Sequence, residues 1–81
     1  MIVTLYTRPG CHLCEEARAA IEALRGEPPA FELREIDIEA DDRLLARMLE
    51  RIPVVEVDGE IVSELVFEPD RLRARTGTLG P

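Results

Sequence analysis

Two cysteines three residues apart, Cys11 and Cys14, lie between a short apolar segment, Ile2–Tyr6, and an amphipathic helix. Apolar residues recur at helical spacing from Leu13 to Leu24, so both thiols fall on the first turn of that helix. There they face each other and can close a small disulfide, and the partial positive charge of the helix N-terminus favours a thiolate. A Cys-x-x-Cys pair beside a βαβ pattern in an intracellular chain indicates a redox dithiol.

The charges around Cys11 act in both directions. Glu15 and Glu16 oppose the thiolate, whereas Arg8 and the helix N-terminus favour it. We expect the favourable contributions to exceed the unfavourable ones by a small margin, which leaves Cys11 moderately activated.

The length and composition of the chain limit the number of domains and argue against several classes of partner. The chain has 81 residues, of which 46% are hydrophobic, and this suffices for one domain with one core. We expect that domain at residues 1–77 and a frayed tail at residues 78–81. The net charge of −7 argues against nucleic acid and anionic membranes as partners, because both bind positively charged protein surfaces.

The sequence also carries a prediction about the compartment. No apolar run approaches the roughly 20 residues that span a bilayer. The N-terminus lacks the basic start and long apolar stretch of a signal peptide. We therefore expect a cytoplasmic protein, where thiols are kept reduced, and we expect it to act as a monomer.

The middle of the chain predicts a strand followed by a helix. The strand is expected at residues 31–38, but its apolar alternation slips near Arg34 and Glu35, so we expect a bulge or a late start. Asp41 and Asp42 are suited to cap the following helix, whose apolar residues we expect in the core.

Turn signals divide the second half of the chain. Asp58-Gly59 favours a two-residue hairpin, because both central positions of that turn need positive φ. Pro69 suits the first position of a last helix, which Gly77 would end. The order β-α-β-α-β-β-α predicts an α/β fold with a four-stranded mixed sheet flanked by helices.

Three segments together point to a known family. They are Tyr6-Thr7-Arg8-Pro9-Gly10-Cys11-His12-Leu13-Cys14, then Arg51-Ile52-Pro53, then the hairpin at Asp58-Gly59. In order and spacing the chain resembles the glutaredoxin-like family of the thioredoxin-fold superfamily, in particular the short bacterial glutaredoxin-like proteins. The resemblance implies a thioredoxin-like α/β fold in which Cys11 is the exposed nucleophile and Cys14 resolves mixed disulfides.

The resemblance also implies a substrate-binding surface beside the dithiol. Pro53 would follow a cis peptide bond and face the cysteines. The main chain around Ile52 and Pro53 would pair with a substrate like an added strand. Arg8 stands where glutaredoxins usually have a lysine that meets a carboxylate of glutathione.

The segment after the hairpin departs from the family pattern. Glutathione-using glutaredoxins usually have Gly-Gly and an acidic residue there, and backbone amides hold the far carboxylate of the tripeptide. This chain has Val62-Ser63-Glu64-Leu65-Val66 instead. Side chains in place of the glycines restrict close backbone approach, and Glu64 adds negative charge. We expect no bound cofactor, and either glutathione or a thioredoxin-reductase type of donor as the electron source.

These residues predict a dithiol–disulfide oxidoreductase that reduces disulfides on a protein or a small molecule. One alternative is a dimer that shares a metal ion or an iron–sulfur cluster through Cys11 and Cys14, because one chain offers too few ligands. Another is a glutaredoxin-like hydrogen donor to ribonucleotide reductase, whose Ser-Gly-Phe-Arg-Pro segment would correspond to Val66-Phe67-Glu68-Pro69. A redox-regulated interaction protein without turnover is a third.

Overall fold

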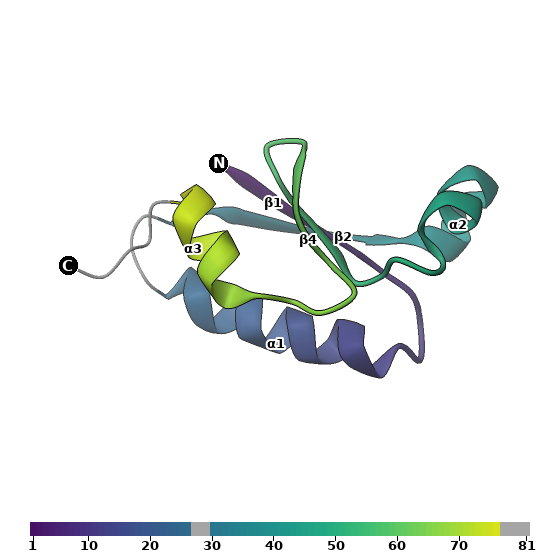
Figure 1. The fold of residues 1–81 in the computed structure, drawn as a ribbon, viewed down its shortest axis with the longest axis horizontal. Coiled ribbons are helices and arrows are strands. Elements are labelled where there is room, and N and C mark those ends of the chain that lie inside the picture. The colour runs from purple at the N-terminus through teal and green to yellow at the C-terminus, as the bar shows by residue number, and fades with distance from the viewer. Residues whose placement is uncertain (27–29, 77–81) are drawn as a thin grey trace.

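The computed structural model describes residues 1–26 and 30–76, which form a sheet with helices packed against it (Figure 1). The elements are β1 (Ile2–Thr7), α1 (His12–Arg25), β2 (Glu32–Asp37), the 3-10 turn η1 (Ile38–Ala40), α2 (Asp42–Met48), β3 (Val54–Val57), β4 (Glu60–Glu64) and α3 (Pro69–Thr76). The predicted order is confirmed, with η1 added after β2. The expected cap at Gly77 and the expected tail at 78–81 lie outside the described residues.

The strands lie in the order β2-β1-β3-β4. β1 and β2 are parallel and are joined through α1, whereas β3 is antiparallel to both β1 and β4. The sheet is therefore mixed, as predicted. Because β1 and β2 run in the same direction, their carboxyl ends meet at the end of the sheet where α1 begins (Figure 1).

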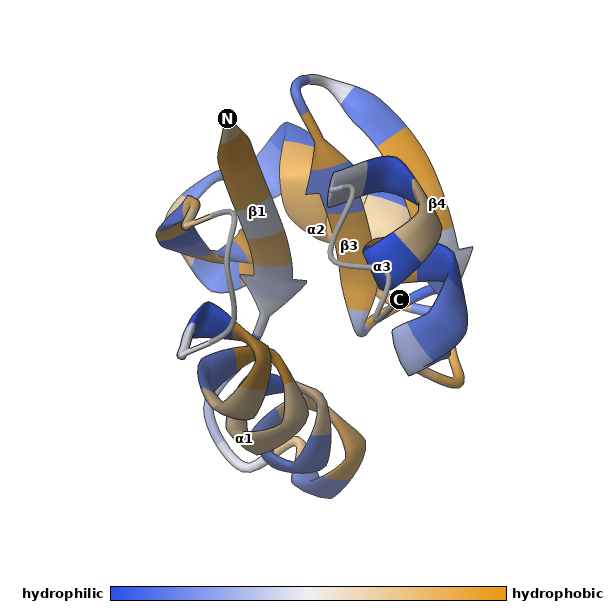
Figure 2. Cartoon of the chain, turned by 90° about the vertical axis from the view of Figure 1, so that its left-hand side faces the viewer, coloured by the Kyte–Doolittle hydropathy of each residue, from blue (hydrophilic) through white to orange (hydrophobic). Residues whose placement is uncertain are grey.

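Each face of the sheet contributes to its own buried cluster, because successive residues of a strand point to opposite faces. The first cluster joins the strands to α1 and α3, and its members include Val3, Leu5, Ile21, Val55 and Leu72. The second cluster joins β3 to α2 and to the start of α1, and its members are Cys14, Ile38, Met48, Ile52 and Val54. Figure 2 shows β1 and β3 as largely hydrophobic and α3 as mostly hydrophilic.

β2 was expected to contain a bulge or to start late, and the structure shows the late start. β2 pairs with β1 in an unbroken parallel register over its whole length, so there is no bulge near Arg34 and Glu35. The strand starts at Glu32, one residue later than expected. The alternation slips because Leu33 packs against the cluster beneath α1, whereas Ile36 has the opposite parity and faces the other side of the sheet. The register shift of this sheet lies between β3 and β4.

The cap of α2 and the hairpin follow the local sequence. Asp41 is the cap, and its Oδ1 accepts hydrogen bonds from the N–H groups of Arg43 and Leu44 at 2.7 and 3.2 Å. In the hairpin, Asp58 has φ +50° and Gly59 has φ +88°, as the predicted turn requires.

Two hydrogen bonds join the segment before β3 to the end of β4. The Nε of Arg51 donates a hydrogen bond to Oε1 of Glu64, and the N–H of Leu65 donates to the carbonyl oxygen of Arg51 at 2.9 Å. The end of β4 is thus fastened to the residues that lead into Pro53. The hydrogen bond from Arg51 lowers the pKa of the Glu64 carboxyl below its ordinary value.

The described part of the chain contains no helix with the length and apolar character needed to cross a membrane.

The lowered pKa of Glu64 gives a prediction with a definite sign. The Arg51–Glu64 pair stabilises the fold above the ordinary glutamate pKa of about 4.3, and this stabilisation is lost as the pH falls through the lowered value. In Arg51→Gln, we expect the Glu64 carboxyl to titrate at a higher pH than in the wild type, as followed by NMR of its carboxyl carbon. Arg34→Gln removes the same charge from a pair with Glu32 and should leave Glu64 unchanged. Equal Glu64 midpoints in the wild type and Arg51→Gln would contradict the assignment.

Candidate redox-active site

Cys11 and Cys14 form a disulfide at the start of α1, with their Cα atoms 5.2 Å apart. Cys11 is the N-cap residue of the helix, and its Sγ accepts a hydrogen bond from the N–H of Cys14 at 3.2 Å. Gly10, with φ +78°, lets the chain turn from β1 into the helix. In the reduced protein, the same N–H and the helix N-terminus favour a thiolate at Cys11.

The two sulfur-bearing residues differ in exposure. Cys14 is 1% exposed and belongs to the cluster with Ile38, Met48 and Val54. Cys11 packs against the edge of that cluster and is partly exposed. A partner can therefore reach Cys11 from outside, whereas the fold shields Cys14.

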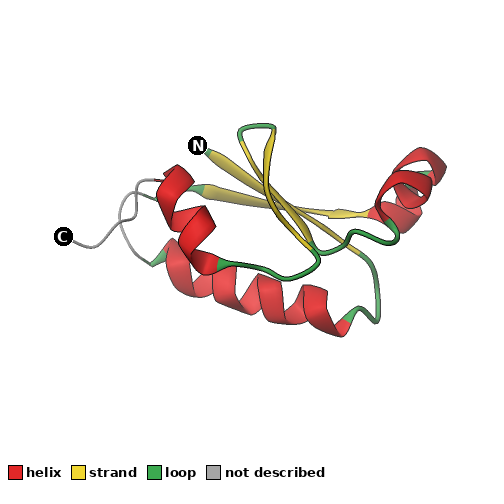
Figure 3. Cartoon of the chain, viewed as in Figure 1, coloured by secondary structure: helices red, strands yellow, loops and turns green. Residues whose placement is uncertain are grey.

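The loop before β3 lies beside the dithiol, at the same end of the sheet as the loop from β1 to α1 (Figure 3). The Ile52–Pro53 bond is cis, as the resemblance implied, and Pro53 is fully buried. Ile52 is 8% exposed and packs in the same cluster as Cys14. Its N–H donates to the carbonyl oxygen of Met48 at 3.0 Å, at the end of α2.

A groove of about 380 Å³ opens at Cys11, and we call it the Cys11 groove. Its lining residues are Arg8, Pro9, Gly10, Cys11, Leu49 and Ile52. It brings together three residues that the sequence singled out, whereas Pro53 is not among those that line it. Leu49 was expected in the core, but it is 44% exposed, because it lies about 100° further round the helical turn than the buried Met48.

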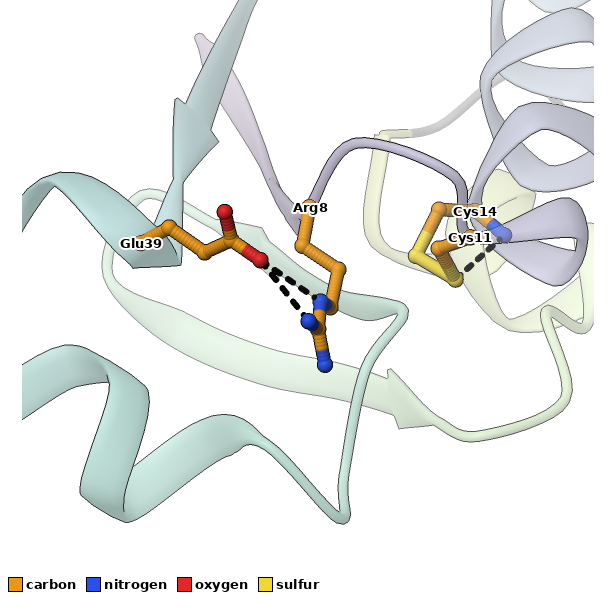
Figure 4. Close-up of a disulfide and its surroundings, with 4 residues drawn as sticks. All are labelled: Arg8, Cys11, Cys14 and Glu39. Atoms are coloured by element: carbon orange, nitrogen blue, oxygen red, sulfur yellow. Dashed lines mark hydrogen bonds and ion pairs between the residues drawn. A yellow bond between two sulfur atoms is a disulfide. The ribbon is translucent and has the colours of Figure 1, made fainter.

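The structure reveals a partner for Arg8 that sequence reasoning missed. Nε and Nη2 of Arg8 both lie on Oε2 of Glu39, at 2.9 and 2.8 Å (Figure 4). Arg8 follows β1, and Glu39 lies in η1, directly after β2. The signal that could have found this pair is the parallel pairing of the two strands, which brings their carboxyl ends together.

Leu13, which lies between the two cysteines in sequence, is at the surface. It is 52% exposed and lines an apolar depression with Leu65, Val66 and Phe67, from the segment between β4 and α3. Leu13 therefore belongs to an apolar patch beside the dithiol and not to the core.

The described residues supply no metal-binding cluster beyond the cysteine pair. Within residues 1–26 and 30–76, no three His, Cys, Asp or Glu side chains gather closely enough to hold an ion. His12 is exposed and lies 4.0 Å from Glu16, one turn along α1. A metal site at Cys11 and Cys14 would need the reduced thiols and ligands from a second chain.

The chain is similar to a known glutaredoxin and to two solved structures. It is 31% identical to a glutaredoxin of Haemophilus influenzae over 65 residues, which cover 72% of this chain and 75% of the relative. A solved structure from X. campestris shares 32% identity with a TM-score of 0.72, and the match covers 96% of this chain and 99% of that one. The glutaredoxin-like protein NrdH-redoxin of Escherichia coli shares 30% identity with a TM-score of 0.60, over 100% of this chain and 97% of that one.

These similarities confirm the thioredoxin-like fold and, with the Cys-x-x-Cys pair, support a thiol redox role. The model of the glutaredoxin-like domain family (DUF836) matches residues 2–75, which is nearly the whole chain. The chain belongs to the glutaredoxin-like domain family.

Proposed function

We propose that this protein is a dithiol–disulfide oxidoreductase that reduces a disulfide on another molecule. The observation that carries the proposal is the asymmetry of the bonded pair. Cys11 is partly exposed at the helix N-terminus, whereas Cys14 is buried within bonding distance of it. A nucleophile must be reachable, and a resolving thiol is best kept from attack by other molecules.

The exchange balances as two successive displacements at sulfur. The Cys11 thiolate attacks one sulfur of the substrate disulfide, forms a mixed disulfide and releases the other substrate sulfur as a thiolate. Cys14 then loses its proton to solvent and attacks the Cys11 sulfur. This step closes the Cys11–Cys14 disulfide and releases the second substrate thiolate. Two electrons pass from the protein to the substrate, and the released thiolates take up protons from water.

Binding of a substrate strand beside Pro53 is the second part of the proposal. Strand addition uses main-chain groups of the receiving segment. Because the Ile52 N–H already donates to Met48, a substrate would depend on carbonyl oxygens of this segment, or would have to displace the end of α2. Contact with Leu13 and Val66 at the neighbouring apolar surface would add to such binding.

We also propose that a thioredoxin-reductase type of donor, rather than glutathione, re-reduces the protein in the cytoplasm. The amides where the family holds a glutathione carboxylate are already engaged, since Leu65 N–H donates to Arg51 and Val66 N–H donates to Glu64 at 2.7 Å. Glu64 also places a carboxylate there, although Arg51 pairs with it. The similar NrdH-redoxin of Escherichia coli is described as glutaredoxin-like with a thioredoxin-like activity profile, which supports this proposal.

Single cysteine substitutions test the roles of the two thiols. Cys14→Ser should accumulate a mixed disulfide between Cys11 and the substrate, because the resolving attack is lost. Cys11→Ser should reduce insulin at no more than the background rate. Mass spectrometry detects the trapped species, and insulin turbidity reports the rate. Reduction of insulin by both variants at the wild-type rate would contradict the proposed exchange.

The choice of donor is tested by offering the oxidised protein two reducing systems in parallel. One holds NADPH and thioredoxin reductase, and the other holds NADPH, glutathione and glutathione reductase. We expect the first system to reduce the oxidised protein faster, as followed by NADPH absorbance. The reason is that the Leu65 and Val66 amides, which would be needed to hold glutathione, already donate hydrogen bonds within the chain. Faster reduction by the glutathione system would contradict the proposed donor without affecting the roles of the cysteines.

A further inference from the structure

We infer that Glu39 determines which disulfides the protein prefers by charge. It neutralises Arg8 at the Cys11 groove, so that the groove does not favour anionic substrates. The inference rests on the proposed function and adds to it a statement about the class of substrate: the protein does not select disulfides for negative charge near their sulfur atoms. Glu39 is a positioning residue in this account, because it acts through Arg8 and does not touch the reacting atoms.

The Cys11 groove contains little charge. Among the described residues that line it, Arg8 alone carries a charge. The other walls are formed by Pro9, Gly10, Leu49 and Ile52, which offer apolar surface and backbone. The charge that a bound substrate meets in this groove is therefore set by the state of one guanidinium group.

The guanidinium group of Arg8 is held closely by Glu39. Two nitrogens of the same guanidinium, Nε and Nη2, lie on a single carboxylate oxygen of Glu39. The two side chains are 40% and 38% exposed, so water screens them only in part. Figure 4 shows the guanidinium of Arg8 directed at Glu39, with the disulfide on the other side of the arginine. Arg8 and Glu39 together present a net charge of zero to a molecule approaching Cys11.

Arg8 also lines a second depression, which Cys14 borders as well. This depression is also bordered by Arg18, together with the acidic residues Glu15, Glu35 and Asp37. Arg18 is also paired, with its Nε 3.1 Å from Oε1 of Glu35. Within the described residues bordering this depression, both cations thus have acidic partners. Of these two cations, Arg8 alone also lines the Cys11 groove, so its release from Glu39 is the change that would attract an anion there.

The preference of each variant for anionic disulfides should follow from the net charge of residues 8 and 39 alone. Glu39→Gln leaves a charge of +1, the wild type and the double variant with Arg8→Gln leave zero, and Arg8→Gln alone leaves −1. Preference for anionic over cationic disulfides should follow that order, because Coulomb energies at one site add with the charge. Glu39→Asp keeps the charge and should retain the wild-type preference.

The test uses single-turnover rates of the pre-reduced protein, freed of reductant, with three disulfides that differ in charge. Glutathione disulfide is anionic, 2-hydroxyethyl disulfide is neutral and cystamine is cationic. The variant-to-wild-type ratio for each probe cancels the probe's own reactivity. For Glu39→Gln we expect a rate about threefold higher with glutathione disulfide, a rate about threefold lower with cystamine, and little change with the neutral probe. At about 0.5 M salt the differences should largely disappear.

Glu22→Gln is the matched control. Glu22 pairs with Arg25 at 3.1 Å, near the other end of α1, so the substitution changes the net charge by the same amount away from the dithiol. We expect its ratios to stay near one with all three probes. Equal ratios for Glu39→Gln and Glu22→Gln would overturn the inference, as would a uniform loss of rate with every probe. If the wild type reduces none of the three probes, the proposed function falls together with the inference; activity with unchanged charge preference overturns the inference alone.

Discussion

The chemistry of this protein depends on where α1 begins. The helix starts at His12, so Cys11 becomes its cap and Cys14 falls one turn further in. The buried stripe of α1, which includes Ala17 and Ile21, fixes the rotation of the helix against the sheet. That rotation buries Cys14 and leaves Cys11 at the surface. One anchored helix thus supplies the spacing of the thiols, their unequal exposure and the N–H donor beside the outer sulfur.

The parallel pairing of β1 and β2 gives the site its electrostatic surroundings. Because both strands end at the same end of the sheet, the segment after β1 meets the segment after β2, and Arg8 reaches Glu39. A second ion pair, between Arg51 and Glu64, neutralises the positive charge of an arginine near Pro53 in the same way. In a protein with a net charge of −7, Arg8 and Arg51 are thus each neutralised by an acidic partner.

Features encoded by neighbouring residues could be predicted from the sequence. The cysteine spacing, the cap at Asp41 and the Asp58-Gly59 turn each depend on a few consecutive residues, and all three appear as expected. Features that depend on the arrangement of elements could not. The Arg8–Glu39 pair joins residues 31 positions apart. The hydrogen bond from the Ile52 N–H to the Met48 carbonyl oxygen is another example, because it depends on where α2 ends and how the chain continues from there.

The most direct test of the central claim is alkylation of the two cysteines in the fully reduced protein. Iodoacetamide is added over a series of pH values, and mass spectrometry follows each cysteine separately. Cys11 should react far faster than Cys14, and the midpoint of its rate against pH should lie below about 8.5, the ordinary pKa of a free thiol. Equal reactivity of the two cysteines, or a Cys11 midpoint at or above that value, would contradict the claim.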